Sequence, residues 1–433
     1  MTLTITPAKL SGAVTPPPSK SQAHRLLIAA ALADGVSVLD NIAYSQDVDA
    51  TLRCLEELGA EFAPVDAASA DLWGGPPSAR CAPISLRVTG IGANAMSPLR
   101  RMAYPRLDCG ESGSTLRFLI PVALAVRGGG EFIGHGRLME RPLGPYFDLF
   151  REKNIFFEQT GNRLTVQGLL TPGEYRLPGN VSSQFFTGLL FALPLLDGPS
   201  VLAPQGELES WDYVTMTLEA QGRFGVEFPT ALSLPPQYHP QGNQTYRPAR
   251  AAVEADWSQA GFWYAARALG SAVEVEGLEP RSAQGDRVLA EYDGLLRGLG
   301  EVTLDVSQCP DLVPALAVQA ALRAGQVTHI VNAGRLRAKE SDRLAAVTAV
   351  LGALGGDIAQ GADSLTISGR ERLTGGGTVD SFGDHRIAMM AAVAATVCEK
   401  PVTLTGSEAV NKSYPTFWAE YVRLGGKVEE ERL

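Results

Sequence analysis

The sequence predicts an α/β protein with two similar lobes, each built from three repeats of the order β-α-β-α-β-β. The chain has 433 residues, which is too long for one ordinary hydrophobic core. A polar start, an apolar helix, a glycine-containing turn and a β-branched strand recur six times in that order. A stretch rich in Pro, Gln and Tyr, from Phe228 to Val253, lacks this periodicity and is expected to connect the two halves.

The first helix of each repeat is apolar on nearly all sides, so we expect it to be buried. These six helices are expected to begin near Lys20, Ser112, Ser182, Ser258, Asp311 and Asp384. Strands are expected after them at residues 36–39, 131–133, 201–203, 273–275, 327–331 and 402–404. Second, amphipathic helices are expected at residues 48–58, 143–152, 213–221, 288–299, 343–354 and 417–424. Short alternating strands, clearest at 163–166 and 365–367, complete the repeat.

The N-terminal segment is expected to cross between the lobes. A strand at residues 3–5 precedes three prolines at 16–18 and can pair with the C-terminal half. We therefore expect one lobe of residues 1–17 and 250–433 and a second of residues 18–249. Two crossings would form a hinge, and closure of such a hinge excludes water from a reaction. An insertion rich in Ala, Pro, Gly and Arg, at about residues 63–106, is expected to form a decorated hairpin or loop.

Composition excludes several classes of protein. The net charge of −10 argues against a nucleic-acid partner, which would favour a basic surface. No uncharged apolar run is long enough to cross a membrane, so we expect no membrane partner. The five cysteines are scattered without metal-ligand spacing or a disulfide framework. These features predict a cytoplasmic protein without a metal site, and we expect it to be a monomer.

The polar helix starts are the candidate binding residues. Equivalent helix ends point the same way in a repeat fold, so the six N-termini are expected to converge on the cleft between the lobes and to attract anions. Three basic clusters recur at one place in their repeats, at residues 137–142, 335–343 and 412–415. A charge run is ordinarily a solvated face, but this recurrence favours an anion site. Asp311 and Glu340 are the candidate carboxylates for proton transfer. Asp311 is as consistent with a helix cap as with a base. Glu340 lies between Lys339 and Arg343, and a carboxylate beside cations stays ionised more readily.

Seven motifs in this order resemble those of one family. They read Pro-Ser-Lys-Ser-Gln-Ala-His-Arg at 18–25, Gly-Glu-Ser-Gly-Ser-Thr-Leu-Arg at 110–117, Glu-Arg-Pro at 140–142, Ser-Ser-Gln at 182–184, Lys-Glu-Ser-Asp-Arg-Leu at 339–344, Gly-Asp-His-Arg at 383–386 and Lys-Ser-Tyr-Pro at 412–415. Together they are similar to the 3-phosphoshikimate 1-carboxyvinyltransferases, also called 5-enolpyruvylshikimate-3-phosphate synthases. The resemblance runs from residue 1 to about residue 425.

This resemblance implies a fold and a reaction. The fold would be two lobes of three repeats each, described as an inside-out α/β barrel. The substrates would be two small anions, shikimate 3-phosphate and phosphoenolpyruvate. The shikimate 5-hydroxyl would add to the enolpyruvyl carbon while the methylene is protonated, and phosphate would then leave the tetrahedral intermediate. The resemblance implies neither a metal nor an organic cofactor.

The resemblance also implies a role for each matching residue. The catalytic residues would be Lys20, Asp311 as proton acceptor and Glu340 as proton donor. The residues that bind shikimate 3-phosphate would be Lys20, Ser21, Arg25, Ser182, Ser183, Gln184, Ser210, Asp311 and Lys339. The residues that bind phosphoenolpyruvate would be Lys20, Gly113, Arg141, Gln184, Arg343, Arg386 and Lys412. Arginine suits these anions because its guanidinium group binds carboxylate and phosphate in bidentate fashion.

The chain departs from the family pattern at three places, and two other functions compete. The insertion is longer than usual in the family, and Glu111 stands where asparagine is common. Arg335 occupies a position that is often asparagine and contributes to shikimate binding, so that role is not transferred. The alternative enzyme, UDP-N-acetylglucosamine 1-carboxyvinyltransferase, would have a cysteine in the loop at 134–142 and an asparagine in place of Ser21. A non-catalytic repeat scaffold would not need cations and carboxylates at equivalent inner positions.

Overall fold

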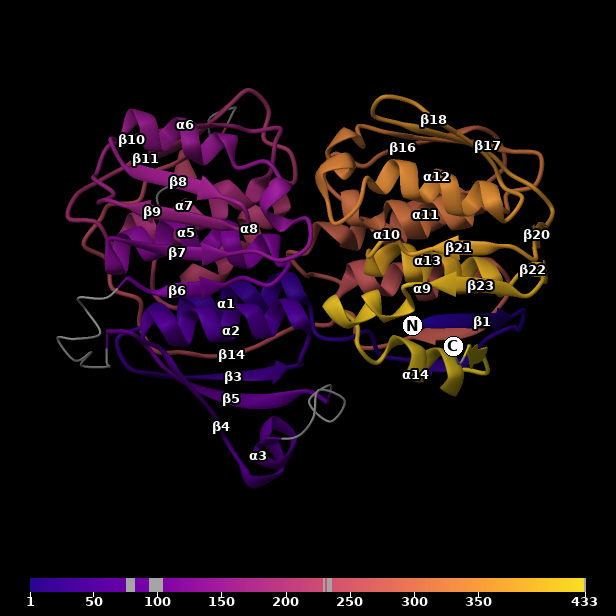
Figure 1. Ribbon diagram of the computed structural model, residues 1–433, viewed down its shortest axis with the longest axis horizontal. Coiled ribbons are helices and arrows are strands. Elements are labelled where there is room, and N and C mark those ends of the chain that lie inside the picture. Colours follow the sequence, from indigo (N-terminus) through magenta and orange to yellow (C-terminus); the bar gives the residue numbers. More distant parts are fainter. Residues whose placement is uncertain (75–81, 93–103, 229, 232–235, 432–433) are drawn as a thin grey trace. The chain divides into compact units, whose positions relative to one another are not determined.

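The computed structural model describes residues 1–74, 82–92, 104–228, 230–231 and 236–431. The chain folds into two compact α/β units (Figure 1). Unit 1 comprises Met1–Pro17 and Ala255–Leu433, and unit 2 comprises Pro18–Glu254. The boundary between the units was expected after residue 249 and lies after residue 254. The reason is that β14 (Arg250–Ala252) pairs with a strand of unit 2.

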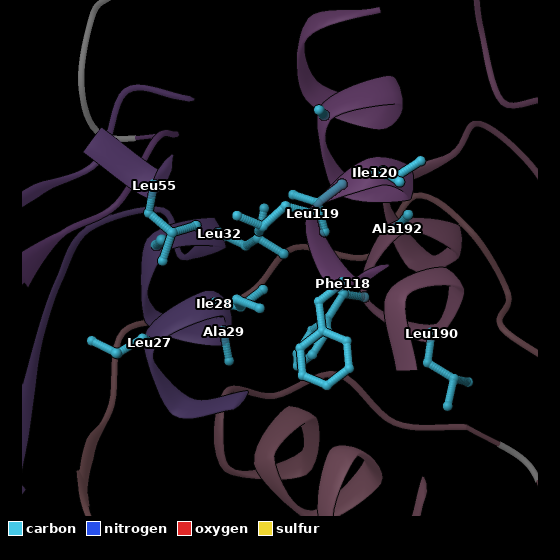
Figure 2. Packing of buried hydrophobic residues seen from close by; sticks show 14 of the residues in the cluster. Leu27, Ile28, Ala29, Leu32, Leu55, Phe118, Leu119, Ile120, Leu190 and Ala192 are labelled. Atoms are coloured by element: carbon cyan, nitrogen blue, oxygen red, sulfur yellow. The ribbon is translucent and has the colours of Figure 1, made fainter. Parts of the chain in front are cut away.

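Unit 2 contains three buried helices. They are α1 (Lys20–Leu32), α5 (Gly113–Arg127) and α7 (Ser183–Ala192). Each begins at a serine cap, because the hydroxyl oxygens of Ser19, Ser112 and Ser182 accept a backbone N–H of the first turn. Figure 2 shows side chains of α1, α5 and α7 in one apolar cluster. The outer helices of the unit are α2 (Gln46–Leu58), α3 (Ala67–Gly74), α6 (Gly144–Glu152) and α8 (Trp211–Arg223).

Three four-stranded sheets cover these helices, and in each a parallel pair adjoins two antiparallel strands. The first sheet has the order β14, β3 (Val36–Ile42), β5 (Ile84–Thr89) and β4 (Glu61–Pro64). The second has the order β6 (Arg106–Asp108), β7 (Gly129–Ile133), β9 (Arg163–Gln167) and β8 (Phe156–Thr160). The third has the order β10 (Glu174–Pro178), β11 (Val201–Gln205), β13 (Gln237–Tyr238) and β12 (Thr230–Ala231).

Unit 1 repeats this plan. Its buried helices are α9 (Trp257–Ala268), α11 (Val313–Ala320) and α13 (His385–Ala395), and its outer helices are α10 (Leu289–Arg297), α12 (Arg343–Ala353) and α14 (Phe417–Arg423). One sheet has the order β16 (Val302–Asp305), β17 (Val327–Val331), β19 (Leu365–Ser368) and β18 (Asp357–Gln360). Another has the order β21 (Thr378–Asp380), β23 (Val402–Thr405), β1 (Thr2–Thr6) and β24 (Lys427–Glu430). Two-stranded sheets join β15 (Ala272–Val275) to β2 (Ser11–Val14) and β20 (Leu373–Gly375) to β22 (Cys398–Lys400).

The N-terminal segment supplies strands to two repeats of unit 1. The predicted strand at 3–5 is confirmed as β1, which pairs antiparallel with β23 and β24. β2 pairs in parallel with β15 and provides the first strand of the fourth repeat. That repeat lacks the expected final hairpin, because only residues 298–301 separate α10 from β16. The fourth repeat is therefore shorter than the predicted β-α-β-α-β-β unit.

The insertion is described only in part. Within it, β5 is a strand that pairs with β3 and β4, and α3 lies between β4 and β5. The remaining parts of the predicted hairpin, at 75–81 and 93–103, lie outside the described residues. Among the residues that the structure describes, no helix combines the length and the apolar character needed to cross a membrane.

Candidate active site

The first turn of α1 places Lys20 against an acidic partner in unit 2. The Lys20 Nζ atom lies 2.7 Å from Asp47 Oδ2, and both side chains are mostly buried. Asp47 belongs to the first turn of α2, where its charge also favours the helix dipole. Ser21 follows Lys20, and its carbonyl oxygen accepts a hydrogen bond from Arg25 NH1 at 2.7 Å. The predicted contact residues Lys20, Ser21 and Arg25 therefore share one helix start.

Arg25 is almost wholly buried, and its guanidinium group is fixed by oxygen atoms of three helices. The acceptors are Ser21 O (2.7 Å), Tyr213 O (2.8 Å), Thr217 Oγ1 (2.9 Å) and Thr187 Oγ1 (3.3 Å). Burial lowers the pKa of Arg25 to about 10, so the group remains cationic at neutral pH. Among the described residues, one NH1 hydrogen has no acceptor. Arg25 is thus a rigid, buried cation at the start of α1.

Gly113 is the first residue of α5, and it lies directly against Arg141. A Cβ atom at Gly113 would lie 2.7 Å from Arg141 NH1 and 2.8 Å from Arg141 Cζ. Arg141 is only 8% exposed, so its guanidinium group has little room to move away. Glycine at this position therefore permits the close approach of a cation to the N-terminus of α5.

We expect Gly113→Ala to raise the KM for an anionic substrate bound at Arg141. The added methyl group must displace the guanidinium group, and the loss of one well-placed charged hydrogen bond corresponds to roughly tenfold in KM. Steady-state kinetics of the variant would measure this change. Gly222→Ala is the matched control, because a Cβ at this position of α8 meets nothing within 4 Å. Equal KM values for parent and Gly113→Ala would contradict the predicted role of Arg141 in binding that substrate.

Gln184 is held by Arg117, a residue to which sequence reasoning gave no role. Arg117 NH1 donates to Gln184 Oε1 at 2.8 Å, and Arg117 NH2 donates to the carbonyl oxygen of Pro142 at 3.0 Å. Gln184 Nε2 in turn donates to Ser114 Oγ at 3.0 Å. Arg117 therefore positions Gln184 and the residue that follows Arg141.

The serines of the predicted set have distinct backbone positions. Ser182 caps α7 through the N–H of Gln184, and Ser183 is the first residue of that helix. Ser210 directly precedes α8 and has the left-handed φ of 53°, which few residues other than Gly and Asn adopt. Such strained conformations concentrate at functional sites, so the backbone of Ser210 agrees with a ligand contact.

In unit 1, the carboxylate of Asp311 is surrounded by three cations. Its Oδ1 atom accepts from Arg343 NH1 at 2.9 Å and from Lys339 Nζ at 3.3 Å, and its Oδ2 atom accepts from Arg386 NH2 at 3.2 Å. Its side chain caps no helix, because α11 begins at Val313 without a side-chain cap bond. The alternative of a simple N-cap for Asp311 is therefore wrong.

The charges in this cluster shift one another's pKa values. Burial alone would raise the pKa of Asp311, but Arg386, Lys339 and Arg343 hold it well below its ordinary value. Burial lowers the pKa of Lys339, although Asp311 opposes that shift. The pKa values of Arg343 and Arg386 are raised, because neighbouring carboxylates outweigh the effect of burial. In the free protein Asp311 is therefore an ionised carboxylate and a weak base.

Arg343 joins both predicted proton-transfer residues to Asp384. Its NH2 atom lies 2.6 Å from Glu340 Oε2, while its Nε atom donates to Asp384 Oδ2 at 2.9 Å. Asp384 is fully buried, accepts a bond from Ser341 Oγ and caps α13 through the N–H of Arg386. Sequence reasoning identified Asp384 only as a helix start. The structure shows that it fixes the guanidinium group of Arg343.

Lys412 completes the set of predicted cations in unit 1, and Arg386 has a second side-chain contact there. Arg386 NH2 donates to Ser258 Oγ at 2.9 Å, and Ser258 lies in the first turn of α9. Lys412 Nζ donates to the carbonyl oxygen of Gly383 at 3.0 Å. Arg335, to which no role was transferred, donates through NH2 to the carbonyl oxygen of Ser307. Among the described residues, no group of three or more His, Cys, Asp and Glu side chains could hold a metal ion.

Buried His24 predicts a pH dependence of stability. Burial, with the charges of Lys20 and Arg25, lowers the pKa of His24 well below 6.5. The unfolded chain therefore takes up a proton near pH 6.5 that the folded chain does not, and the free energy of unfolding falls as the pH drops further. The expected slope is up to ~1.4 kcal/mol per pH unit. Denaturant unfolding of the parent and of His24→Asn should differ by this slope, and parallel pH profiles would contradict it.

Comparison with solved structures shows which known fold the chain shares. The chain matches an EPSP synthase from Acinetobacter baumannii with a TM-score of 0.76 and 22% identity, covering 99% of this chain and 100% of the other. It matches the enolpyruvyl transferase NikO from Streptomyces tendae with a TM-score of 0.73 and 17% identity, covering 99% and 98% of the two chains. At these identities the likeness shows the fold, which is that of enolpyruvyl transferases.

Sequence comparison identifies the family. The profile described as EPSP synthase (3-phosphoshikimate 1-carboxyvinyltransferase) matches residues 5–421. The 3-phosphoshikimate 1-carboxyvinyltransferase of Clostridium kluyveri is 41% identical over 448 residues, covering 99% of this chain and 98% of the relative. That of Clostridioides difficile is 40% identical over 449 residues, with the same coverage. The chain therefore belongs to the EPSP synthase family, as the sequence motifs predicted.

Proposed function

We propose that the chain transfers the enolpyruvyl group of phosphoenolpyruvate to the 5-hydroxyl of shikimate 3-phosphate and releases phosphate. Membership of the EPSP synthase family supports this activity. The structural observation that carries it is the cluster in unit 1, where an ionised Asp311 and Glu340 share buried cations. Such a cluster combines anion binding with two carboxylates for proton transfer.

The residues of unit 2 are proposed to bind shikimate 3-phosphate. Its phosphate group would be held by Ser182, Ser183 and Ser210, with Ser21 and Arg25 contacting the rest of the molecule. Lys20 would contact both substrates. Gln184, whose amide group is fixed by Arg117 and Ser114, would also contact both. Arg141 and Gly113 would contribute to phosphoenolpyruvate binding, since a cation at a helix start suits an anionic group.

The residues of unit 1 are proposed to bind phosphoenolpyruvate and to move protons. Arg343, Arg386 and Lys412 would bind its phosphate and carboxylate groups, and Lys339 would contact shikimate 3-phosphate. An anion bound at Arg386 and Arg343 would offset the positive charge beside Asp311. The pKa of Asp311 would then rise toward its ordinary range. Substrate binding itself would thus make Asp311 a stronger base.

The proposed reaction balances in two steps. In the first, the 5-hydroxyl oxygen bonds to the enolpyruvyl carbon, Asp311 accepts the hydroxyl proton and Glu340 gives a proton to the methylene carbon. In the second, the carbon–oxygen bond to phosphate breaks, and the new methyl group returns a proton to the Glu340 carboxylate, which restores the double bond. The proton held by Asp311 would pass to the departing phosphate, so both carboxyl groups return to their starting states. Lys20 and the arginines would stabilise the charge on the leaving phosphate.

A comparison of two acceptors tests this function. Phosphate release from phosphoenolpyruvate would be measured with shikimate 3-phosphate and, separately, with UDP-N-acetylglucosamine. We expect release with the first acceptor only, because the loop at 134–142 has no cysteine. Release with the second acceptor only would favour the alternative enolpyruvyl transferase, and release with neither would contradict the proposed activity.

We further propose that the enzyme acts as a monomer in the cytoplasm, where both small anionic substrates would reach it by diffusion. Light scattering coupled to size-exclusion chromatography would give a mass near the 45.9 kDa of one chain. A mass near that of two chains would contradict the monomer.

A further inference from the structure

His24 lies between Lys20 and Arg25 in α1, yet the proposed reaction gives it no role. Its side chain is fully buried, and its Nδ1 atom lies 2.7 Å from Thr51 Oγ1 in α2. Its Nε2 atom has no hydrogen-bond partner among the described residues. A buried polar group beside two substrate-binding residues is expected to serve a purpose beyond packing.

The contact of His24 with Thr51 begins a chain of hydrogen bonds. Thr51 Oγ1 lies 2.7 Å from Thr115 Oγ1, and Thr115 Oγ1 donates to Ser112 Oγ at 2.8 Å. Ser112 Oγ also accepts the backbone N–H of Thr115 at 3.2 Å and so caps α5. All four side chains are buried, so the chain runs through the interior of unit 2.

The donors and acceptors fix the direction of this chain. Each hydroxyl group has one hydrogen to donate. Thr115 Oγ1 donates its one hydrogen to Ser112 Oγ at 2.8 Å or to the carbonyl oxygen of Asp47 at 3.5 Å. With either acceptor, Thr115 must accept from Thr51, and Thr51 must accept from His24. His24 is therefore the donor at Nδ1, and its Nε2 atom carries no hydrogen. This tautomer leaves no buried N–H group without an acceptor, whereas the opposite tautomer would leave one at Nε2.

This chain of hydrogen bonds connects α1, the helix that carries Lys20, to Ser112, the residue that precedes Gly113. Lys20 is on α1 and its partner Asp47 is on α2, while Ser112 precedes Gly113, which lies against Arg141. We propose that four positioning residues fix Lys20 relative to the Gly113–Arg141 contact, so that both can bind phosphoenolpyruvate. These residues are His24, Thr51, Thr115 and Ser112. This role rests on the proposed function.

The tautomer of His24 tests the chain without any substrate. Nitrogen-15 chemical shifts of the histidine rings distinguish Nδ1–H, Nε2–H and doubly protonated forms. We expect His24 to be neutral and protonated at Nδ1 throughout the neutral pH range. An Nε2–H tautomer or an imidazolium at neutral pH would overturn the proposed direction. This result is independent of turnover, so it stands apart from a failure of the proposed function.

Kinetics of Thr51→Val test the positioning role. Valine keeps the size of threonine but removes the central hydroxyl group. We expect the KM for phosphoenolpyruvate to rise about 3- to 10-fold, the change that one lost neutral hydrogen bond produces. The KM for shikimate 3-phosphate should change less, because Ser182 and Ser183 of α7 are outside the chain. His24→Leu should act like Thr51→Val, and His24→Asn should restore the parent value because its amide can donate from the place of Nδ1.

Tyr246→Phe is the matched control for these variants. Its hydroxyl group is also buried in unit 2, where it donates to Phe191 O at 3.0 Å and accepts from Gln221 Nε2 at 2.7 Å. This substitution removes a buried hydroxyl group that is not part of the hydrogen-bond chain, so we expect no change in either KM. Equal KM values for Thr51→Val and Tyr246→Phe, or equal changes for both substrates, would overturn the positioning role.

Discussion

Replacing Asp311 by asparagine is expected to lower kcat by about 10²- to 10⁴-fold, the usual contribution of a general base. Asparagine keeps the size of the side chain but cannot accept the hydroxyl proton. It also turns an amide NH2 group toward either Arg386 or the pair of Lys339 and Arg343, since one carboxylate oxygen faces each side. Single-turnover kinetics with both substrates would measure the loss.

Two controls separate chemistry from folding in this variant. Thermal unfolding would show whether Asp311→Asn retains the native structure, and the dissociation constant of shikimate 3-phosphate would show whether the ligand still binds. A second variant, Asp342→Asn, alters a carboxylate that caps α12 through the N–H of Ala345 and should leave kcat near the parent value. A folded Asp311→Asn enzyme with parent kcat would remove Asp311 from proton transfer.

Replacing Lys20 by methionine is expected to lower kcat/KM by about 10²- to 10³-fold, which corresponds to the loss of one donor that stabilises developing charge. Methionine has a similar length and keeps the apolar part of the side chain. The ammonium group, which lies 2.7 Å from Asp47 Oδ2, is lost. Steady-state kinetics with each substrate varied in turn would measure the change.

The partner of Lys20 complicates this variant, and a double substitution resolves the complication. In Lys20→Met the buried carboxylate of Asp47 loses its cation, which alone is destabilising. Lys20→Met/Asp47→Asn removes both charges and should recover stability without recovering kcat/KM. Recovery of kcat/KM in the double variant would show that Lys20 acts through Asp47 and not on the substrates.

Local patterns in the sequence predicted most of the fold. Each buried first helix is apolar on nearly all sides, and most have a Ser or Asp cap, so these helices were recognisable without tertiary information. The pairing of strands was harder to predict from the sequence. β14 pairs with β3, and Arg250 lies opposite Val38 although almost the whole sequence of unit 2 separates them. β2 was not predicted for the same reason, because it pairs with β15, and its Gly12 lies opposite Val273. Pairings of this kind leave no periodic signal.

The candidate site was predicted through its motifs, whereas the residues that hold it in place were not. Lys339, Glu340 and Arg343 share one short segment, and their mixed charges mark it in the sequence. Asp384 contacts Arg343 from 41 positions away, so its positioning role depends on the packing of α12 against α13. The bond of Arg117 to Gln184 spans 67 positions and is equally invisible to a motif.

The product formed in D₂O tests the proposed addition–elimination reaction most directly. Protonation of the methylene carbon by solvent-derived deuterium, followed by loss of one hydrogen from the resulting methyl group, places deuterium in the enol methylene of the product. Mass spectrometry of the product from phosphoenolpyruvate and shikimate 3-phosphate would detect it. We predict an enolpyruvyl product that carries deuterium at this carbon. A product free of deuterium, or no product from the folded parent enzyme, would contradict the account.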